Sequence, residues 1–204
     1  MAAQIVLATH NPHKVEEFAA IVAATRPDIE VVGYDGPEPV EDGVTFADNA
    51  LIKARTAAAH TGLPALADDS GICVDVLGGA PGVFSAYWAG HRKDVAANLE
   101  LLLDQLSDIA DPHRTAQFVS TIALVVPGGA DAPDREHVVE GVWLGRLATE
   151  ASGRGGFGYD PIFIPDGQAA GAARTAGEYS AAEKNADSHR ARAFTALAPL
   201  LSRL

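Results

Sequence analysis

The chain is poor in cysteine and in long apolar runs, and each shortage excludes a class of protein. Cys73 is its single cysteine among 204 residues, so an intramolecular disulfide and a cysteine-rich zinc site are both excluded. No apolar run approaches the roughly 20 residues of a membrane-spanning helix. We expect no signal peptide, because no basic segment precedes a long apolar one at the N-terminus. These shortages predict a cytoplasmic protein with no membrane partner.

Positive charge is scarce as well. The chain carries a net charge of −12 at pH 7, and its four lysines are Lys14, Lys53, Lys93 and Lys184. Nucleic acids and anionic membrane surfaces bind basic patches, so we expect neither as a partner. An acidic protein can still bind a polyanionic ligand where cations are concentrated locally or a metal ion intervenes. Three of the four lysines lie in the motifs considered below, which is consistent with such a local concentration.

The remaining composition is that of a globular α/β protein, with 48% apolar and 21% charged residues. Apolar patterning predicts strands at 4–8, 29–34, 65–76, 115–126 and 136–148, and helices at 12–25, 45–61, 92–107 and 188–202, the last bent or ended near Pro199. A Pro-Gly-Gly turn at 127–129 predicts that the last two strands form an antiparallel hairpin. Early βα alternation followed by two consecutive strands predicts an α/β fold with a mixed sheet. No repeat or long linker interrupts the chain, so we expect residues 1–204 to form a single domain.

A polar segment, Thr9-His10-Asn11-Pro12-His13-Lys14, follows the first predicted strand and opens the first predicted helix. A helix start offers free backbone N–H groups and the positive end of the helix dipole. Together with a hydroxyl and a lysine, these are the groups that bind phosphate. The alternative is that Thr9 and Asn11 only cap the helix while Lys14 lies on a solvated face.

An acid pair, Asp68-Asp69, lies between apolar runs and is followed by Ser70 and Gly71. Adjacent residues of an extended segment point to opposite sides, so only one of the two carboxylates can face a given cleft. A carboxylate there can bind Mg²⁺ or accept a proton from water. The alternative is an Asp-Asp-Ser-Gly turn without a chemical role. An acidic loop containing Glu41 supplies a second possible oxygen ligand.

The helix predicted from Thr45 begins with a pattern that resembles a capping box, with Asp48 in place of glutamate. Asn49 and Lys53 are four residues apart and share one face of that helix. The alternative is an ordinary polar face.

Two further clusters lie in the C-terminal third. The glycine-rich segment 153–163 contains Phe157 and Tyr159, which can stack on a nucleobase or, alternatively, belong to the core. The last helix begins at Asp187 or Ser188 and places His189 and Arg190 in its first turn. Positive charge there opposes the helix dipole, which favours a bound anion; the alternative is a surface His-Arg pair.

Taken together, these motifs resemble the inosine/xanthosine triphosphate pyrophosphatase family, which removes deaminated purine nucleotides from the precursor pool. The resemblance rests on Thr9-x-Asn11-x-x-Lys14, Leu66-Ala67-Asp68-Asp69-Ser70-Gly71, Gly78-Gly79-Ala80-Pro81-Gly82-Val83, Phe157-Gly158-Tyr159-Asp160-Pro161 and Ser188-His189-Arg190. The five motifs occur in the order of the family and cover residues 4 to 200. His10 is a departure, since the family often has a smaller residue there.

The resemblance implies a Mg²⁺-dependent homodimer that cleaves ITP, dITP or XTP to the nucleoside monophosphate and pyrophosphate. The implied fold is a strongly twisted mixed sheet flanked by helices, with two lobes and an active-site cleft between them. Asp69 is the implied general base and Mg²⁺ ligand, with Glu41, or Asp42 in its place, as the second ligand, and Lys53 and Asp68 in support. The implied substrate-binding residues are Thr9, His10, Asn11, Pro12, His13, Lys14, Ser70, Phe157, Gly158, Tyr159, Asp160, Lys184, His189 and Arg190.

Alternative functions differ in how many of these residues they use. A related pyrophosphatase acting on other modified nucleotides would use the same phosphate-binding residues. A nucleotide-binding regulator without catalysis would have no need of a hydrolytic carboxylate such as Asp69, and a purely structural domain leaves the cationic helix start at residues 189–190 without a role. For the homodimer, Tyr87, Trp88 and Trp143 are candidate interface aromatics.

Overall fold

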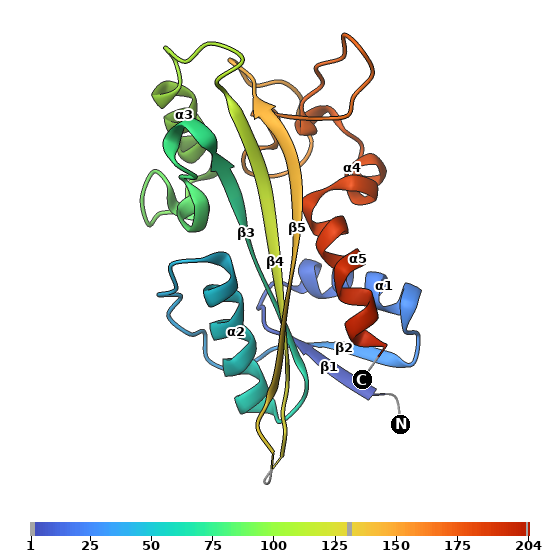
Figure 1. Cartoon of the computed structure of the whole chain (residues 1–204). Coiled ribbons are helices and arrows are strands. Elements are labelled where there is room, and N and C mark those ends of the chain that lie inside the picture. Colours follow the sequence, from blue (N-terminus) through green and yellow to red (C-terminus); the bar gives the residue numbers. More distant parts are fainter. Residues whose placement is uncertain (1–2, 130–131, 203) are drawn as a thin grey trace. The chain divides into compact units, whose positions relative to one another are not determined.

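The computed structural model describes residues 3–129, 132–202 and 204, except for the side chains of His13, Glu17 and Thr25. Six strands form one sheet in the order β2-β1-β3-β4-β5-β6 (Figure 1). The strands are β1 (Ala3–Leu7), β2 (Ile29–Gly33), β3 (Ala65–Val74), β4 (Thr115–Val126), β5 (Arg135–Leu147) and β6 (Phe163–Pro165), and the helices are α1 (Pro12–Thr25), α2 (Phe46–Thr61), α3 (Val95–Gln105), α4 (Ala181–Asp187) and α5 (His189–Leu201).

The sheet is mixed. β1 is parallel to β2 and to β3, whereas β6 is antiparallel to β5. β4 and β5 are hydrogen-bonded neighbours and run in opposite directions (Figure 1), as expected of the hairpin. The α/β fold class with a mixed sheet is therefore confirmed. No helix in the described part of the chain is long and apolar enough to cross a membrane.

The predicted elements are present, with two omissions. β6 and α4 are too short to give a periodic signal, and the sequence did not predict them. α3 begins at Val95, later than predicted, because the Asp94 side chain accepts a hydrogen bond from the Ala97 N–H and caps the helix there. α5 continues past Pro199 to Leu201, so the proline does not end it.

The chain divides into two compact units. Unit 1 consists of Met1–Asp69, Thr121–Glu140 and Ala193–Leu204, and unit 2 of Ser70–Ser120 and Gly141–Arg192. Three strands and α5 pass from one unit into the other. The single-domain organisation stays a prediction.

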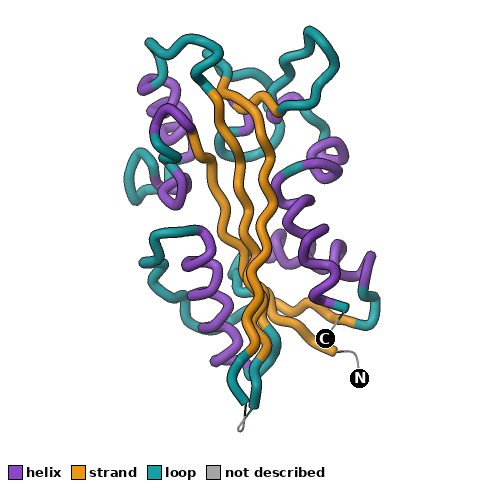
Figure 2. Tube along the Cα trace, in the orientation of Figure 1, coloured by secondary structure: helices purple, strands orange, loops and turns teal. Residues whose placement is uncertain are grey.

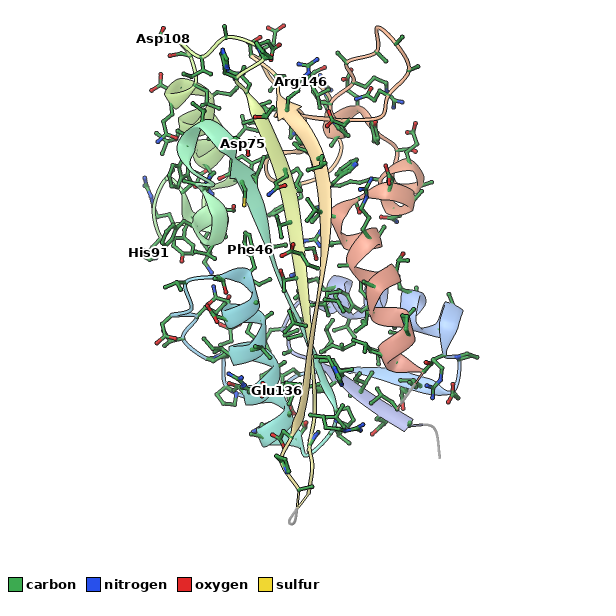
Figure 3. The ribbon with its side chains drawn as sticks, in the orientation of Figure 1. Phe46, Asp75, His91, Asp108, Glu136 and Arg146 are labelled. Atoms are coloured by element: carbon green, nitrogen blue, oxygen red, sulfur yellow. The ribbon has the colours of Figure 1, made fainter. Side chains whose placement is uncertain are left out.

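In unit 1, alternate residues of the strands contact different helices. Buried residues of β1, β3 and β4 pack with α1 and α5, where Phe18 and Phe194 meet edge to face with ring centroids 4.4 Å apart. The intervening residues pack with the alanine-rich face of α2, and small side chains allow close packing there. On the outer side of α2, Arg55 forms an ion pair at 2.7 Å with Glu136 on β5, which is labelled in Figure 3.

In the core of unit 2, α3 packs with the strands and with the segments on either side of β6. The chain between β6 and α4 is mostly loop (Figure 2). Arg114 is 1% exposed, and its guanidinium donates to the backbone carbonyls of Leu106, Ile109, Leu147 and Ala148 at 2.6 to 3.1 Å. It thereby satisfies carbonyls at the end of α3 that lack a helical partner. Trp143 is 1% exposed in this core, so its prediction as an interface aromatic is wrong.

Candidate active site

The acid pair on β3 has the two-sided arrangement predicted for it. The Asp68 carboxylate accepts hydrogen bonds from Lys14 Nζ at 3.1 and 3.3 Å. The Asp69 carboxylate instead faces α2, where Lys53 Nζ lies 3.1 Å from Oδ1 and Asn49 Nδ2 lies 3.3 Å from Oδ2. The turn alternative is excluded, because both residues lie within β3.

Asp69 and Glu41 both form an ion pair with Lys53. Lys53 Nζ is 3.1 Å from Asp69 and 3.0 Å from Glu41, and the Lys53 and Asp69 side chains are 15% and 16% exposed. Asn49 also accepts a hydrogen bond from the Gly43 N–H at 2.9 Å, which fixes the loop that carries Glu41. We call Glu41, Asn49, Lys53, Asp68 and Asp69 the carboxylate centre.

The local sequence explains how α2 presents these groups. Thr45 and Asp48 form the predicted capping box, which sets the start of the helix. Asn49 and Lys53 then lie one turn apart on the face toward β3, where both contact Asp69. Their role as an ordinary solvated face is therefore excluded.

Burial dominates the electrostatics of the carboxylate centre. It raises the pKa of Asp69, and the attraction of Lys53 opposes this rise only in part, while the negative charge of Glu41 adds to it. Burial would lower the pKa of Lys53, but the charges of Asp69, Glu41 and Asp68 together raise it. Lys53 is thus held as a cation, and Asp69 is more basic than an ordinary aspartate.

The donor set of the carboxylate centre fits Mg²⁺. In proteins this ion is bound through one or two carboxylates, with waters and substrate phosphates completing the shell. Asp69 and Glu41 supply two carboxylates that already converge on one positive charge. Among the described residues, no three His, Cys, Asp or Glu side chains form a group that could hold a metal.

The 9–14 loop joins β1 to α1. Thr9 Oγ1 accepts a hydrogen bond from the Asn11 N–H at 3.2 Å, and the Asn11 carbonyl accepts from the Lys14 N–H at 3.1 Å. Pro12 occupies the first position of α1, where its missing N–H costs nothing. Lys14 does not lie on a solvated face, since it is paired with Asp68. The side chain of His13 lies outside the described residues.

A cavity of about 210 Å³ lies within unit 2. Seven of its lining residues are among the predicted substrate-binding residues: Ser70, Phe157, Gly158, Tyr159, Lys184, His189 and Arg190. The sequence did not predict the seven other lining residues, one of which, Lys93, is a cation. They are Gly71, Ser85, Ala86, Lys93, Val95, Asn98 and Phe118. Phe118 and Asn98 carry no local signal, because each belongs to an element that reads as ordinary core.

Asp160 organises one wall of this cavity. Its carboxylate is 1% exposed, accepts a hydrogen bond from the Phe157 N–H at 2.5 Å and forms an ion pair with Lys184. Gly156 has φ +76°, and a Cβ there would lie 2.1 Å from the Asp160 carboxylate. Any larger residue at position 156 would therefore clash with Asp160, so the wall requires glycine there.

Aromatic rings form the other walls. His189 is 5% exposed and stacks on Phe118 with ring centroids 4.9 Å apart. Tyr159 donates a hydrogen bond to the Ser85 carbonyl at 2.9 Å, and its burial raises the pKa of its hydroxyl. Phe157, in contrast, is 74% exposed, which leaves its ring free to stack on a ligand. Tyr159 thus belongs to the core, whereas Phe157 does not.

The start of α5 has the predicted capping. Ser188 Oγ accepts a hydrogen bond from the Ala191 N–H at 3.4 Å, and the Ser188 carbonyl accepts from the Arg192 N–H. His189 and Arg190 therefore lie in the first turn and line the cavity. His189 is buried rather than part of a surface pair.

The fold and these two groups of side chains define an α/β protein with a buried acidic centre and an aromatic ligand cavity. Asp69, the last residue of unit 1, is covalently followed by Ser70, which lines the cavity of unit 2. Each of the two groups is of a kind that an enzyme acting on a nucleotide uses.

Comparison with known proteins gives the family. The model of the Ham1 family matches residues 5–200. A protein of Leifsonia xyli named dITP/XTP pyrophosphatase is 59% identical over 201 residues, covering 98% of this chain and 96% of its own. Among solved structures, a HAM1 protein from Coxiella burnetii has a TM-score of 0.86 at 40% identity, covering 99% and 100% of the two chains. A nucleoside-triphosphatase described as a dITP/XTP pyrophosphatase, from Mycobacterium abscessus, has a TM-score of 0.79 at 48% identity, covering 96% and 99%.

The chain belongs to the Ham1 family, and the resemblance inferred from its motifs is confirmed.

Proposed function

We propose that the protein hydrolyses deaminated purine nucleoside triphosphates (ITP, dITP and XTP) to the monophosphate and pyrophosphate, and so removes them from the nucleotide pool. The observation that carries this proposal is the buried Asp69 carboxylate, held by Lys53 and Asn49, directly before a residue that lines an aromatic cavity. Relatives across the full length of the chain bear the name dITP/XTP pyrophosphatase.

Asp69 acts as the general base in this proposal. Hydrolysis at the α-phosphorus needs a group that takes a proton from the attacking water. Burial raises the pKa of Asp69, which makes its carboxylate a stronger base than that of an ordinary aspartate. Lys53 and Asn49 hold the carboxylate in place through one hydrogen bond to each oxygen.

The charge of the triphosphate is met by the lysines and by Mg²⁺. Asp69 and Glu41 would hold the ion, which when bound neutralises phosphate charge and helps the pyrophosphate to leave. Lys53 lies between these carboxylates, and Lys14 lies in the first turn of α1, at the end of the 9–14 loop. Local cations of this kind allow a chain of net charge −12 to bind a polyanion.

The cavity of unit 2 would bind the base. Phe157 offers an exposed ring for stacking. The side chains of Asn98 and Ser85 are hydrogen-bonded to backbone groups. Lys184 also lines the cavity, and its ammonium carries three N–H donors, so that besides its ion pair with Asp160 it has donors for a purine 6-oxo group. A lysine donates only, so an amino group at that position would be left unpaired. We therefore propose Lys184 as the residue that favours inosine over adenosine.

The test is pyrophosphate release from ITP, dITP and XTP, with ATP, GTP and modified pyrimidine triphosphates alongside, in the presence of Mg²⁺ and after its chelation. We expect release from the deaminated purines, lost with chelator. Pyrophosphate release only from the triphosphate of another base would contradict the proposed substrate. Orthophosphate as the first product would contradict the proposed reaction. Binding without release from any nucleotide would support the regulator instead.

We also propose that the protein acts in the cytoplasm as a homodimer. Phe84 is 52% exposed next to Tyr87 and Trp88 in unit 2, and large exposed apolar side chains are typical of interfaces. Sedimentation of the wild type and of Phe84→Asp tests this: a monomeric variant supports an interface at Phe84, and an unchanged dimer places the interface elsewhere.

A further inference from the structure

His10 is held on three sides within unit 1. Its Nδ1 lies 2.9 Å from a Glu38 carboxylate oxygen, and its Nε2 lies 3.0 Å from the Gly36 carbonyl oxygen. Its ring stacks on Tyr34, with an interplanar angle of 1° and centroids 5.6 Å apart. Each ring nitrogen therefore faces an acceptor, and neither points to a ligand in the 9–14 loop.

The two contacts join two parts of unit 1. One ring nitrogen of His10 contacts the Glu38 side chain and the other contacts the backbone at Gly36, so the ring bridges the 9–14 loop and the segment 34–38.

The partners of His10 form a built site. Tyr34 is 6% exposed and its hydroxyl donates to the Pro37 carbonyl at 2.9 Å. A Cβ at Gly36 would lie 2.4 Å from that hydroxyl, so only glycine lets the chain pass over the ring and direct its carbonyl to His10. Behind Tyr34 lie the other titratable groups: the His60 ring meets Tyr34 edge to face at 5.7 Å, and His60 Nε2 is 3.9 Å from Asp35.

We propose that His10 is a positioning residue that ties the 9–14 loop to the segment 34–38 through its contacts with Glu38, Gly36 and Tyr34. It does so in place of contacting the nucleotide, and the inference rests on the proposed function for its kinetic consequence. His10 lies between Thr9 and Asn11, whose hydrogen bond shapes the loop. Glu38 lies in the same segment that leads to Glu41 of the carboxylate centre. Holding the loop in its bound form lowers the entropy lost when phosphate binds.

The experiment measures kcat and KM for ITP in wild type, His10→Gln, Glu38→Gln and the double variant. We expect either single variant to raise KM about two- to fivefold, as an exposed pair of this kind contributes, with kcat unchanged. The double variant adds nothing further, because each single variant already breaks the pair. Additive increases in KM, or a loss in kcat, would overturn the inference.

His60→Gln is the matched control, because it removes the other histidine ring that contacts Tyr34. We expect it to leave KM for ITP unchanged, and a rise in KM equal to that of His10→Gln would overturn the role of His10. Thermal unfolding of the four proteins gives a readout that needs no turnover: the effects of His10→Gln and Glu38→Gln are non-additive. Absence of turnover in wild type would contradict the proposed function alone, whereas additive effects on unfolding would contradict the pairing of His10 with Glu38.

Discussion

The carboxylate centre and the cavity differ in how much open space they contain. The carboxylate centre is filled: Lys53 is bound to Asp69 and Glu41, and Lys14 to Asp68. The cavity is hollow, about 210 Å³, and is lined by the rings of Phe118, Phe157, Tyr159 and His189 together with small, polar and basic side chains. The buried charge of Asp160 beside it is paired to Lys184. In the proposed function, the first region would bind and activate through charge, and the second would select through shape and a few donors. We therefore expect that chemistry and specificity can be changed separately.

The largest effect is expected in the carboxylate centre. Asp69→Asn keeps the size of the side chain and removes the base, so turnover of ITP should fall by about 10² to 10⁴, while ITP still binds. The measurement is pyrophosphate release together with direct binding. Asp68→Asn is the comparison on the other side of β3, and we expect it to raise KM through Lys14 more than it lowers kcat. Equal losses of kcat in the two variants would contradict the separate roles of the two aspartates.

The next effect concerns the wall of the cavity. Gly156→Ala places a Cβ against the Asp160 carboxylate and also strains a backbone with φ +76°, so we expect about 2–4 kcal/mol of destabilisation. Gly158→Ala is a matched control with φ +65° and nothing within 4 Å of its Cβ, and it should cost only the backbone strain, about 1 kcal/mol. Chemical denaturation of both measures the difference. Equal losses would mean that contact with Asp160 has no effect.

A smaller effect is expected for base selection. Lys184→Met removes the proposed donor to the 6-oxo group and should raise KM for ITP about 10- to 100-fold, with less effect on ATP. Arg174→Met is the control. Arg174 forms an ion pair at 3.0 Å with Glu183, which lies on α4 next to Lys184, and it does not line the cavity. Its KM values should stay within about twofold. An equal loss for ITP and ATP in Lys184→Met would assign Lys184 to phosphate binding.

The smallest effect is a gain in stability. Folding raises the pKa of Asp69, so the folded state holds the proton more tightly than the unfolded state. Stability is therefore lost as the pH rises above the unfolded-state pKa of this carboxyl. Asp69→Asn should therefore raise the melting temperature at pH 7 by about 1–4 °C. The gain should vanish below the unfolded-state pKa, where the carboxyl is protonated in both states. Asp108→Asn, at the exposed position labelled in Figure 3, changes the net charge equally and should give no gain.

The sequence predicted what local patterns control. The strand and helix periods, the capping box at Thr45 and the opposite directions of Asp68 and Asp69 all follow from adjacent or nearly adjacent residues. The pairing of His10 with Glu38 and the stacking of Phe118 on His189 join residues 28 and 71 positions apart. No local pattern marks such partners, because the fold brings them together. For the same reason Trp143 appeared available for an interface although it is buried.

The most direct test of the division between the two regions is calorimetric binding of ITP and ATP, with Mg²⁺, to the Asp69→Asn variant. If the carboxylate centre supplies chemistry and the cavity supplies selection, this variant binds ITP in preference to ATP as the wild type does, while its turnover is lost. Loss of the preference together with turnover would show that Asp69 takes part in selecting the base, and would contradict the separation.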